Sequence, residues 1–268
     1  MKTWLFVLVG IAFLAGTLWG KKPKETQTAL KHQTDLKESN LSDYLLWCLG
    51  LSGILTELNQ FNHFTLDYEL DAKEKDMLKQ CLEEWWDIYN REDLLATLDW
   101  LGGEGGHNAE FMECALFFKK NPEITSADLQ QMCDADAEVS FYKYDFVRRF
   151  HSEVGDRGIL AWDYGRYVFL CRQGYTFGYL NEVETATLIE EAGMVIEKHF
   201  KSWAEFGENF IIGRRFWACD DPQNEKELYR EAQDTYYELL SDSGAWTRVP
   251  WEWSKSTKTY ATQSSFPS

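Results

Sequence analysis

Three charged residues lie in a segment that is otherwise apolar and aromatic, AWDYGRYVFLCRQGYTFGYL at residues 161–180. On a helix, Asp163 and Arg166 would be neighbours, because residues three positions apart lie on the same face. Trp162 belongs to the same apolar stripe, and Arg172 follows further along the segment. Such a group could bind an anionic small molecule and act on it, or it could form a structural ion-pair network inside a core. The apolar surroundings favour the structural network.

A second segment, WAEFGENFIIGRRFWAC at residues 203–219, places Arg214 on an apolar stripe. A buried guanidinium without a partner is costly, so each arginine must meet a carboxylate, a carbonyl or a bound anion. Gly165 and Gly213 precede Arg166 and Arg214, which indicates that the two helices pack closely there. The carboxylates that we expect as partners are those of Asp87, Asp163, Glu184 and Glu205.

The other residue patterns that could carry chemistry are weak. His107, Glu110 and Cys114 could share a helix face, but their spacing is not an established metal signature, so we predict no metal site. The glycine-rich loop at 102–106 lacks the strand before it and the Lys-Ser/Thr after it that a phosphate loop needs. There is no nucleophile elbow, and the five histidines are scattered. The sequence therefore predicts no catalytic residue and no cofactor.

The elements that carry these residues have the pattern of helices. Apolar residues recur at spacings of three and four, while strand alternation is weak. Helix-start pairs occur at Asn90, Asn181 and Ser202, each with an acidic residue three positions later. We predict one all-α domain over residues 41–253, with a central helix at about 159–173.

The two ends of the chain differ from this domain. Residues 3–20 form a run of 18 residues without a charge, which as a helix would nearly span the hydrocarbon core of a bilayer. We predict a transmembrane signal-anchor helix at 1–20, a polar linker at 21–40 and a disordered tail at 254–268. A cleaved signal peptide is the alternative for the first segment.

The lysines after the apolar run determine the orientation that we expect. Lys21, Lys22 and Lys24 slightly outweigh Lys2 and the amino terminus, so the positive-inside rule places the domain in the cytoplasm. The chain is therefore predicted to be a single-pass protein of the bacterial inner membrane. Its six cysteines are far apart, with no C-x-x-C pair, and we expect buried free thiols.

Charge is distributed unevenly along the chain. The first 40 residues contain 6 basic and 3 acidic residues, which leaves 21 basic and 41 acidic residues, a net charge of −20, in residues 41–268. So acidic a domain repels phosphate backbones, which argues against nucleic-acid binding and favours a basic protein partner. Simple solubility is the alternative explanation.

Several blocks of sequence, taken in order, resemble one bacterial family. They are WWDIYNREDLLATLDWLGGEGGH (85–107), ILAWDYGRYVFLCRQGYTFGYLNEVE (159–184), SWAEFGENFIIGRRFW (202–217) and a closing W-x-x-x-x-W from Trp246 to Trp251. In this order they are similar to the family catalogued as domain of unknown function 1266, over about residues 45–252. The resemblance implies an all-helical bacterial domain without an assigned activity, and it transfers no catalytic residue.

We expect a membrane-anchored protein that binds another protein or serves as an envelope-associated accessory factor. One alternative is an enzyme that acts on an anionic small molecule through a pocket of Asp163, Arg166 and Arg214. Another is an immunity-type inhibitor whose acidic surface covers a basic protein. A large cavity walled by the three charged residues would favour the enzyme, whereas a flat acidic face with an apolar centre would favour a binding protein.

Overall fold

The computed structural model describes residues 36, 39–103, 105–135 and 140–260. These residues form α-helices and short 3-10 helices, and no strand occurs among them. The all-α class predicted from the helical periodicity is therefore confirmed for the described part of the chain. All six cysteines lie in this part and none forms a disulfide there. Four are buried, as expected, whereas Cys81 and Cys133 are only partly buried.

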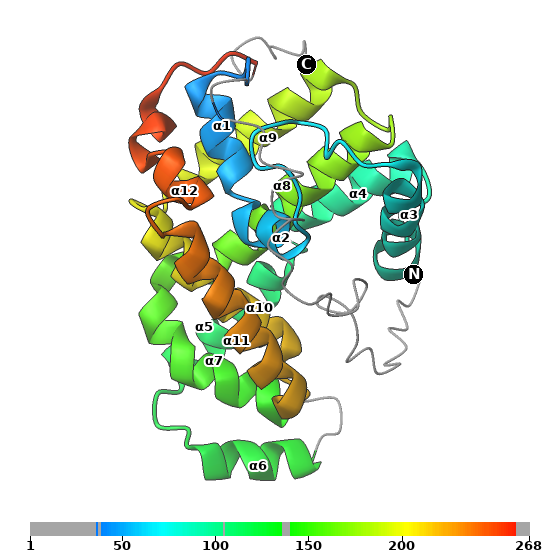
Figure 1. The fold of residues 1–268 in the computed structure, drawn as a ribbon. Coiled ribbons are helices and arrows are strands. Elements are labelled where there is room, and N and C mark those ends of the chain that lie inside the picture. The colour runs from blue at the N-terminus through cyan, green and yellow to red at the C-terminus, as the bar shows by residue number, and fades with distance from the viewer. Residues whose placement is uncertain (1–35, 37–38, 104, 136–139, 261–268) are drawn as a thin grey trace, which may run out of the picture.

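The helices follow one another with short connections, apart from the longer irregular segment between α2 and α3 (Figure 1). Their bounds are α1 Asp43–Gly50, α2 Gly53–Leu58, α3 Ala72–Trp86, α4 Arg91–Gly102, α5 His107–Lys120, α6 Ser126–Ala135, α7 Phe141–Val154, η2 Gly155–Arg157, α8 Leu160–Thr176, α9 Glu182–Ile196, α10 Trp203–Ala218, α11 Pro222–Leu239, α12 Ala245–Arg248 and η3 Trp251–Lys255.

The central helix is α8, as the sequence predicted. Thirteen of its 17 residues are buried, because apolar side chains project from it on all sides. It packs against α2, α4, α5, α9 and α10, so that most of the molecule is built around it. The observed bounds exceed the predicted range of 159–173 by three residues at the carboxyl end.

Helices α8 and α10 approach each other closely at two glycines. A Cβ atom on Gly165 would lie 2.6 Å from a ring carbon of Phe210, and a Cβ atom on Gly213 would collide with the side chain of Trp162. Real Cβ atoms do not come so close to a neighbour, so larger side chains would push the helices apart. The close packing inferred from the two glycines is confirmed.

The predicted helix starts are also confirmed. The side chains of Asn90, Asn181 and Ser202 each accept a hydrogen bond from the backbone N–H three residues later, at the first turns of α4, α9 and α10. Asn181 and Glu184 form a complete capping box, since the Glu184 side chain accepts the Asn181 N–H in return.

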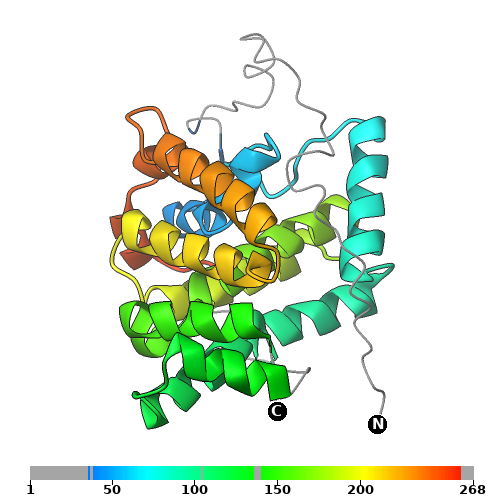
Figure 2. The same cartoon turned by 90° about the horizontal axis from the view of Figure 1, so that it is seen from below.

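Helix α3 lies at an edge of the molecule in both views (Figures 1 and 2). Leu78 and Leu82 are the two buried residues of this 15-residue helix. The irregular segment before it packs through Phe61 and Tyr68 against Phe169 of α8, in a small cluster separate from the main core. This segment is therefore anchored to α8 although it has no regular structure.

The structure corrects one expectation about the ends of the chain. Residues 254–260 were expected to be disordered, but they pack on the domain, because the N–H groups of Thr259 and Tyr260 are bonded to a buried carboxylate. At the other end, Ser39 of the predicted linker donates to the carbonyl of Phe64.

The predicted transmembrane segment, residues 1–20, lies outside the described residues, as do most of the linker and residues 261–268. Within the described ranges, none of the helices combines the length and apolar character that crossing a bilayer requires.

Candidate functional site

The carboxylate of Asp163 caps a helix that is distant in sequence. Its Oδ2 atom accepts the backbone N–H of Asn108 at 2.7 Å, in the first turn of α5. The first N–H groups of a helix have no partner inside the helix, and a negative charge near them is favourable. A Cβ atom on Gly106 would collide with this carboxylate, so glycine at that position allows the approach. Asp163 therefore fixes the start of α5 against α8.

The guanidinium of Arg166 completes this contact. Arg166 donates to Asp163 Oδ1, and its Nη2 lies 2.9 Å from Nδ1 of His107. The rings of Trp162, Trp86 and Trp100 surround the guanidinium, with centroids 4.4, 5.5 and 6.0 Å from its central carbon. Cation–π contacts and a charged partner together offset the desolvation of a buried arginine.

The protonation of His107 follows from this arrangement. Burial, and then the positive charges of Arg166 and Lys143, lower its pKa to about 2. His107 is therefore neutral at physiological pH, and its Nδ1 accepts the hydrogen bond from Arg166. Burial raises the pKa of Asp163, and the positive charge of Arg166 opposes that increase. Burial lowers the pKa of Arg166, and Asp163 opposes that decrease, so each of these two residues stabilises the charged form of the other.

Arg172 makes a different set of contacts, although it is also completely buried. It donates to Thr56 Oγ1 at 3.1 Å, to the carbonyl of Thr65 at 2.8 Å and to the carbonyl of Asn62. Its guanidinium carbon lies 4.2 Å from the ring centroid of Tyr68. Arg172 thus attaches the irregular segment before α3 to α8.

Arg214 is not brought together with Asp163 and Arg166 by hydrogen bonds or ion pairs. Its Nη2 donates to Glu231 of α11 at 2.7 Å, and Glu231 was not among the carboxylates expected from the sequence. Its Nη1 atom is buried without a partner among the described residues. The three residues thus form two separate contacts, one between α8 and α5 and one between α10 and α11.

Two of the remaining carboxylates proposed as partners bind other arginines, and the third ends a helix. Glu184 forms a bidentate pair with Arg91, with distances of 2.8 and 3.0 Å, and Glu205 pairs with Arg157. Asp87 ends α3 in the left-handed conformation, with φ of 52°. These contacts connect neighbouring elements, which supports a structural role for the charged residues singled out from the sequence.

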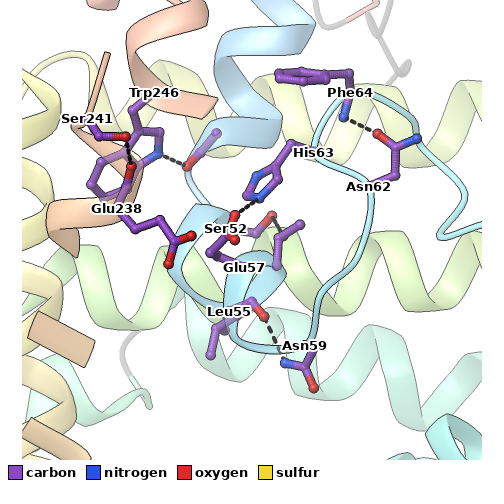
Figure 3. A network of polar contacts seen from close by, with 12 residues as sticks. Ser52, Leu55, Glu57, Asn59, Asn62, His63, Phe64, Glu238, Ser241 and Trp246 are labelled. Atoms are coloured by element: carbon purple, nitrogen blue, oxygen red, sulfur yellow. Dashed lines mark hydrogen bonds and ion pairs between the residues drawn. The ribbon is translucent and has the colours of Figure 1, made fainter. Parts of the chain in front are cut away.

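A group of Ser, His and Glu side chains near α2 has residue types found in hydrolases but not their geometry (Figure 3). His63 Nε2 lies 2.7 Å from Glu57 Oε2, and this hydrogen bond lowers the pKa of Glu57. The Ser52 hydroxyl instead donates to the carbonyl of Leu49 and lies 3.1 Å from Thr56 Oγ1. A nucleophile needs contact with its base. This group is therefore a polar contact network that extends along α2, from its N-cap Ser52 to Glu57 in its last turn.

Sequence reasoning missed a hollow on the surface of the domain. It has a volume of about 250 Å³ and lies where α4, α8 and α9 meet. Two carboxylates and two tyrosines provide its polar and aromatic lining, and the full set is Leu98, Asp99, Gly102, Gly103, Tyr164, Tyr167, Glu191, Ala192 and Val195. We call this feature the α4–α9 hollow.

The tyrosines of the α4–α9 hollow are held in position by their neighbours. Their rings lie 5.9 Å apart at 29°, and the Tyr164 hydroxyl donates to the carbonyl of Gly102 at 3.3 Å. Burial, and then nearby groups that include Glu191 and Asp99, raise the pKa of Tyr167, so the hydroxyl stays protonated. Carboxylates beside aromatic faces attract cations, and the hollow is large enough for one long basic side chain.

The signal for the hollow in the sequence was small. Tyr164 and Tyr167 belong to the aromatic segment that was singled out, and Gly102 and Gly103 belong to the glycine-rich loop. Glu191, however, lies on a helix that the sequence does not place next to either. Only the packing of α9 against α8 brings these residues together.

Comparisons with known proteins identify a family and leave the activity open. The uncharacterized protein YbeU of Escherichia coli K12 is 25% identical over 181 residues, which are 64% of this chain and 75% of YbeU. The uncharacterized protein YbeR of the same organism is 25% identical over 186 residues, with the same shares of the two chains. No solved structure matches. The model of the family described as protein of unknown function (DUF1266) matches residues 81–251, so the chain belongs to the DUF1266 family.

Proposed function

We propose that this protein is a membrane-tethered accessory factor whose helical domain binds a basic segment of another protein. The observation that carries the proposal is the α4–α9 hollow, where Asp99 and Glu191 lie beside the rings of Tyr164 and Tyr167. A lysine or arginine side chain of the partner would enter the hollow, where both carboxylates and both rings favour a positive charge.

The charge of the domain supports this proposal. With a net charge of −20 in residues 41–268, the domain attracts basic proteins over distances of about a Debye length, ~8 Å at physiological salt. The buried charged groups give no comparable support to the enzyme alternative. Arg166 is already paired with Asp163 of the same helix, α8. Arg214 of α10 is paired with Glu231 of α11.

The membrane tether is the second part of the proposal, and it is supported by the uncharged run at residues 3–20 and by Lys21, Lys22 and Lys24. Fusing alkaline phosphatase or a fluorescent protein to the carboxyl end tests it. We expect cytoplasmic fluorescence and membrane sedimentation. Phosphatase activity, or a mature chain that begins near residue 21, would contradict this orientation.

The test of partner binding is affinity capture of the tagged full-length chain from detergent-solubilised native membranes, at low and high salt. The variant Asp99→Asn/Glu191→Gln removes both charges from the hollow. The matched control Glu182→Gln/Asp234→Asn removes two carboxylate charges from α9 and α11 outside the hollow lining.

We expect a salt-sensitive partner that the wild type and the control capture equally. Capture by the hollow variant should be about tenfold weaker, which corresponds to ~1.4 kcal/mol. Equal capture by all three chains would place the interface elsewhere. If no protein is captured at low salt and a small molecule remains bound to the purified chain, the enzyme alternative becomes the better explanation.

A further inference from the structure

A short segment after the last helix carries a lysine and packs on an acidic part of the domain. After η3, residues 256–260 have no helical structure and run past α1 (Figure 1). Their contacts are with α1 and α9, and the ring of Tyr260 packs against the main core. We call this face, formed by Tyr44 of α1, Glu190 of α9 and Glu197 at the end of α9, the α1–α9 face.

Glu190 binds the backbone of this segment. Its two carboxylate oxygens accept the N–H groups of Thr259 at 3.0 Å and of Tyr260 at 2.8 Å. Glu190 is 0% exposed, so these two donors replace water around a buried charge. The chain bends at Thr259 and Tyr260, which turns two consecutive N–H groups toward one carboxylate, whereas in a straight strand they would point to opposite sides.

Lys258 adds a contact that depends on sequence. Its Nζ atom lies 4.4 Å from the ring centroid of Tyr44 and 3.4 Å from Glu197 Oε1. Cation–π attraction and an ion pair thus act on the same ammonium group. This face therefore binds a segment in which a lysine comes just before a bend whose two N–H groups donate to Glu190.

We propose that the α1–α9 face is a docking site for a lysine-bearing segment of a partner protein that bends directly after its lysine. The chain's own residues 255–260 occupy it until such a segment displaces them. That the displacing segment comes from a protein rests on the proposed function. The tail is tethered, so its effective concentration at the face is on the order of 1 mM. A partner segment must bind tightly enough to compete with the tail at that concentration. The tail therefore sets a threshold for partner binding.

The test uses the full-length chain in detergent and a fluorescently labelled peptide, SKSTKTY, which has the sequence of residues 254–260. The variant Lys258→Ala/Thr259→Pro releases the tail, because it removes the ammonium group and one N–H donated to Glu190. Fluorescence anisotropy measures binding of the peptide. We expect a Kd below ~1 mM for the released chain, and binding at least tenfold weaker for the wild type, whose tail competes.

Four controls assign that binding to the face. Adding Glu190→Gln or Glu197→Gln to the released chain should weaken peptide binding about tenfold. The peptide SKSTATY, in which alanine replaces the lysine that corresponds to Lys258, should also bind about tenfold more weakly. The two acidic positions are tested separately because Glu190→Gln lies in the core. The Glu182→Gln/Asp234→Asn variant, whose changes lie outside both the hollow and this face, should leave peptide binding unchanged.

Equal binding to the wild-type and released chains, or no binding at ~1 mM, would overturn the proposal. So would binding that is insensitive both to the Glu197→Gln change and to the lysine of the peptide. Such a failure would leave capture of a partner through the α4–α9 hollow unaffected, and the two proposals are therefore distinguishable.

Discussion

The guanidinium of Arg166 and the carboxylate of Asp163 form an ion pair inside the core, with 6% and 1% of their side chains exposed. Each member also holds another element, since Asp163 caps α5 and Arg166 contacts Trp86 at the end of α3. This pair therefore joins α3 and α5 to the central helix.

Replacing Arg166 with methionine should strongly destabilise the domain. The change leaves Asp163 buried without its charged partner, which costs about 3–5 kcal/mol of unfolding free energy. Urea denaturation followed by circular dichroism measures the loss. As a control, Lys119→Met breaks the exposed pair with Asp156 and should cost less than about 1 kcal/mol. Similar losses for the two variants would refute the structural role of Arg166.

The pair formed by Arg214 and Glu231 should show a strong coupling. Glu231→Gln leaves a guanidinium that is 2% exposed and already has one unpartnered nitrogen, so we expect a loss of about 3 kcal/mol or more. The double variant Arg214→Met/Glu231→Gln removes the stranded charge and should recover part of that loss. Thermal denaturation of the single and double variants tests this, and additive losses would disprove the coupling.

His107 should make the stability of the domain depend on pH. Its pKa is about 2 in the folded chain and 6.5 for an exposed histidine, so the unfolded chain binds the extra proton between these values. The contribution of neutral His107 is complete above pH 6.5 and decreases as the pH falls below it. Between pH 7 and pH 5, the wild type should lose about 2 kcal/mol more unfolding free energy than His107→Gln. Parallel pH profiles for the two chains would contradict this.

Arg172→Lys should loosen the segment before α3 while α8 remains folded. A lysine has a compact ammonium group and cannot donate in a planar fork to Thr56, Asn62 and Thr65 at the same time. Hydrogen exchange read by mass spectrometry should show faster exchange at residues 59–71 and little change in α9. Unchanged exchange in 59–71 would mean that the aromatic cluster of Phe61 and Tyr68 is sufficient to hold this segment.

Much of the local structure follows from neighbouring residues and could be predicted from the sequence. The caps at Asn90, Asn181 and Ser202 depend on hydrogen bonds to the third residue along the chain. The ion pair of Asp163 and Arg166 depends on helical spacing, and the central position of α8 on its apolar character. These interactions have a range of about one helical turn, which the order of residues alone specifies.

The contacts between distant parts of the chain were decided by the tertiary structure. Glu231 pairs with Arg214, Glu190 binds the tail and Glu191 lines the α4–α9 hollow. All three occur in helical segments, and nothing in their spacing along the sequence indicates these different roles. Residues 254–260 have too few apolar groups to pack by themselves, yet the buried carboxylate of Glu190 binds their N–H groups. Pairing of a buried charge depends on which helices lie side by side, and that depends on the packing of the whole core.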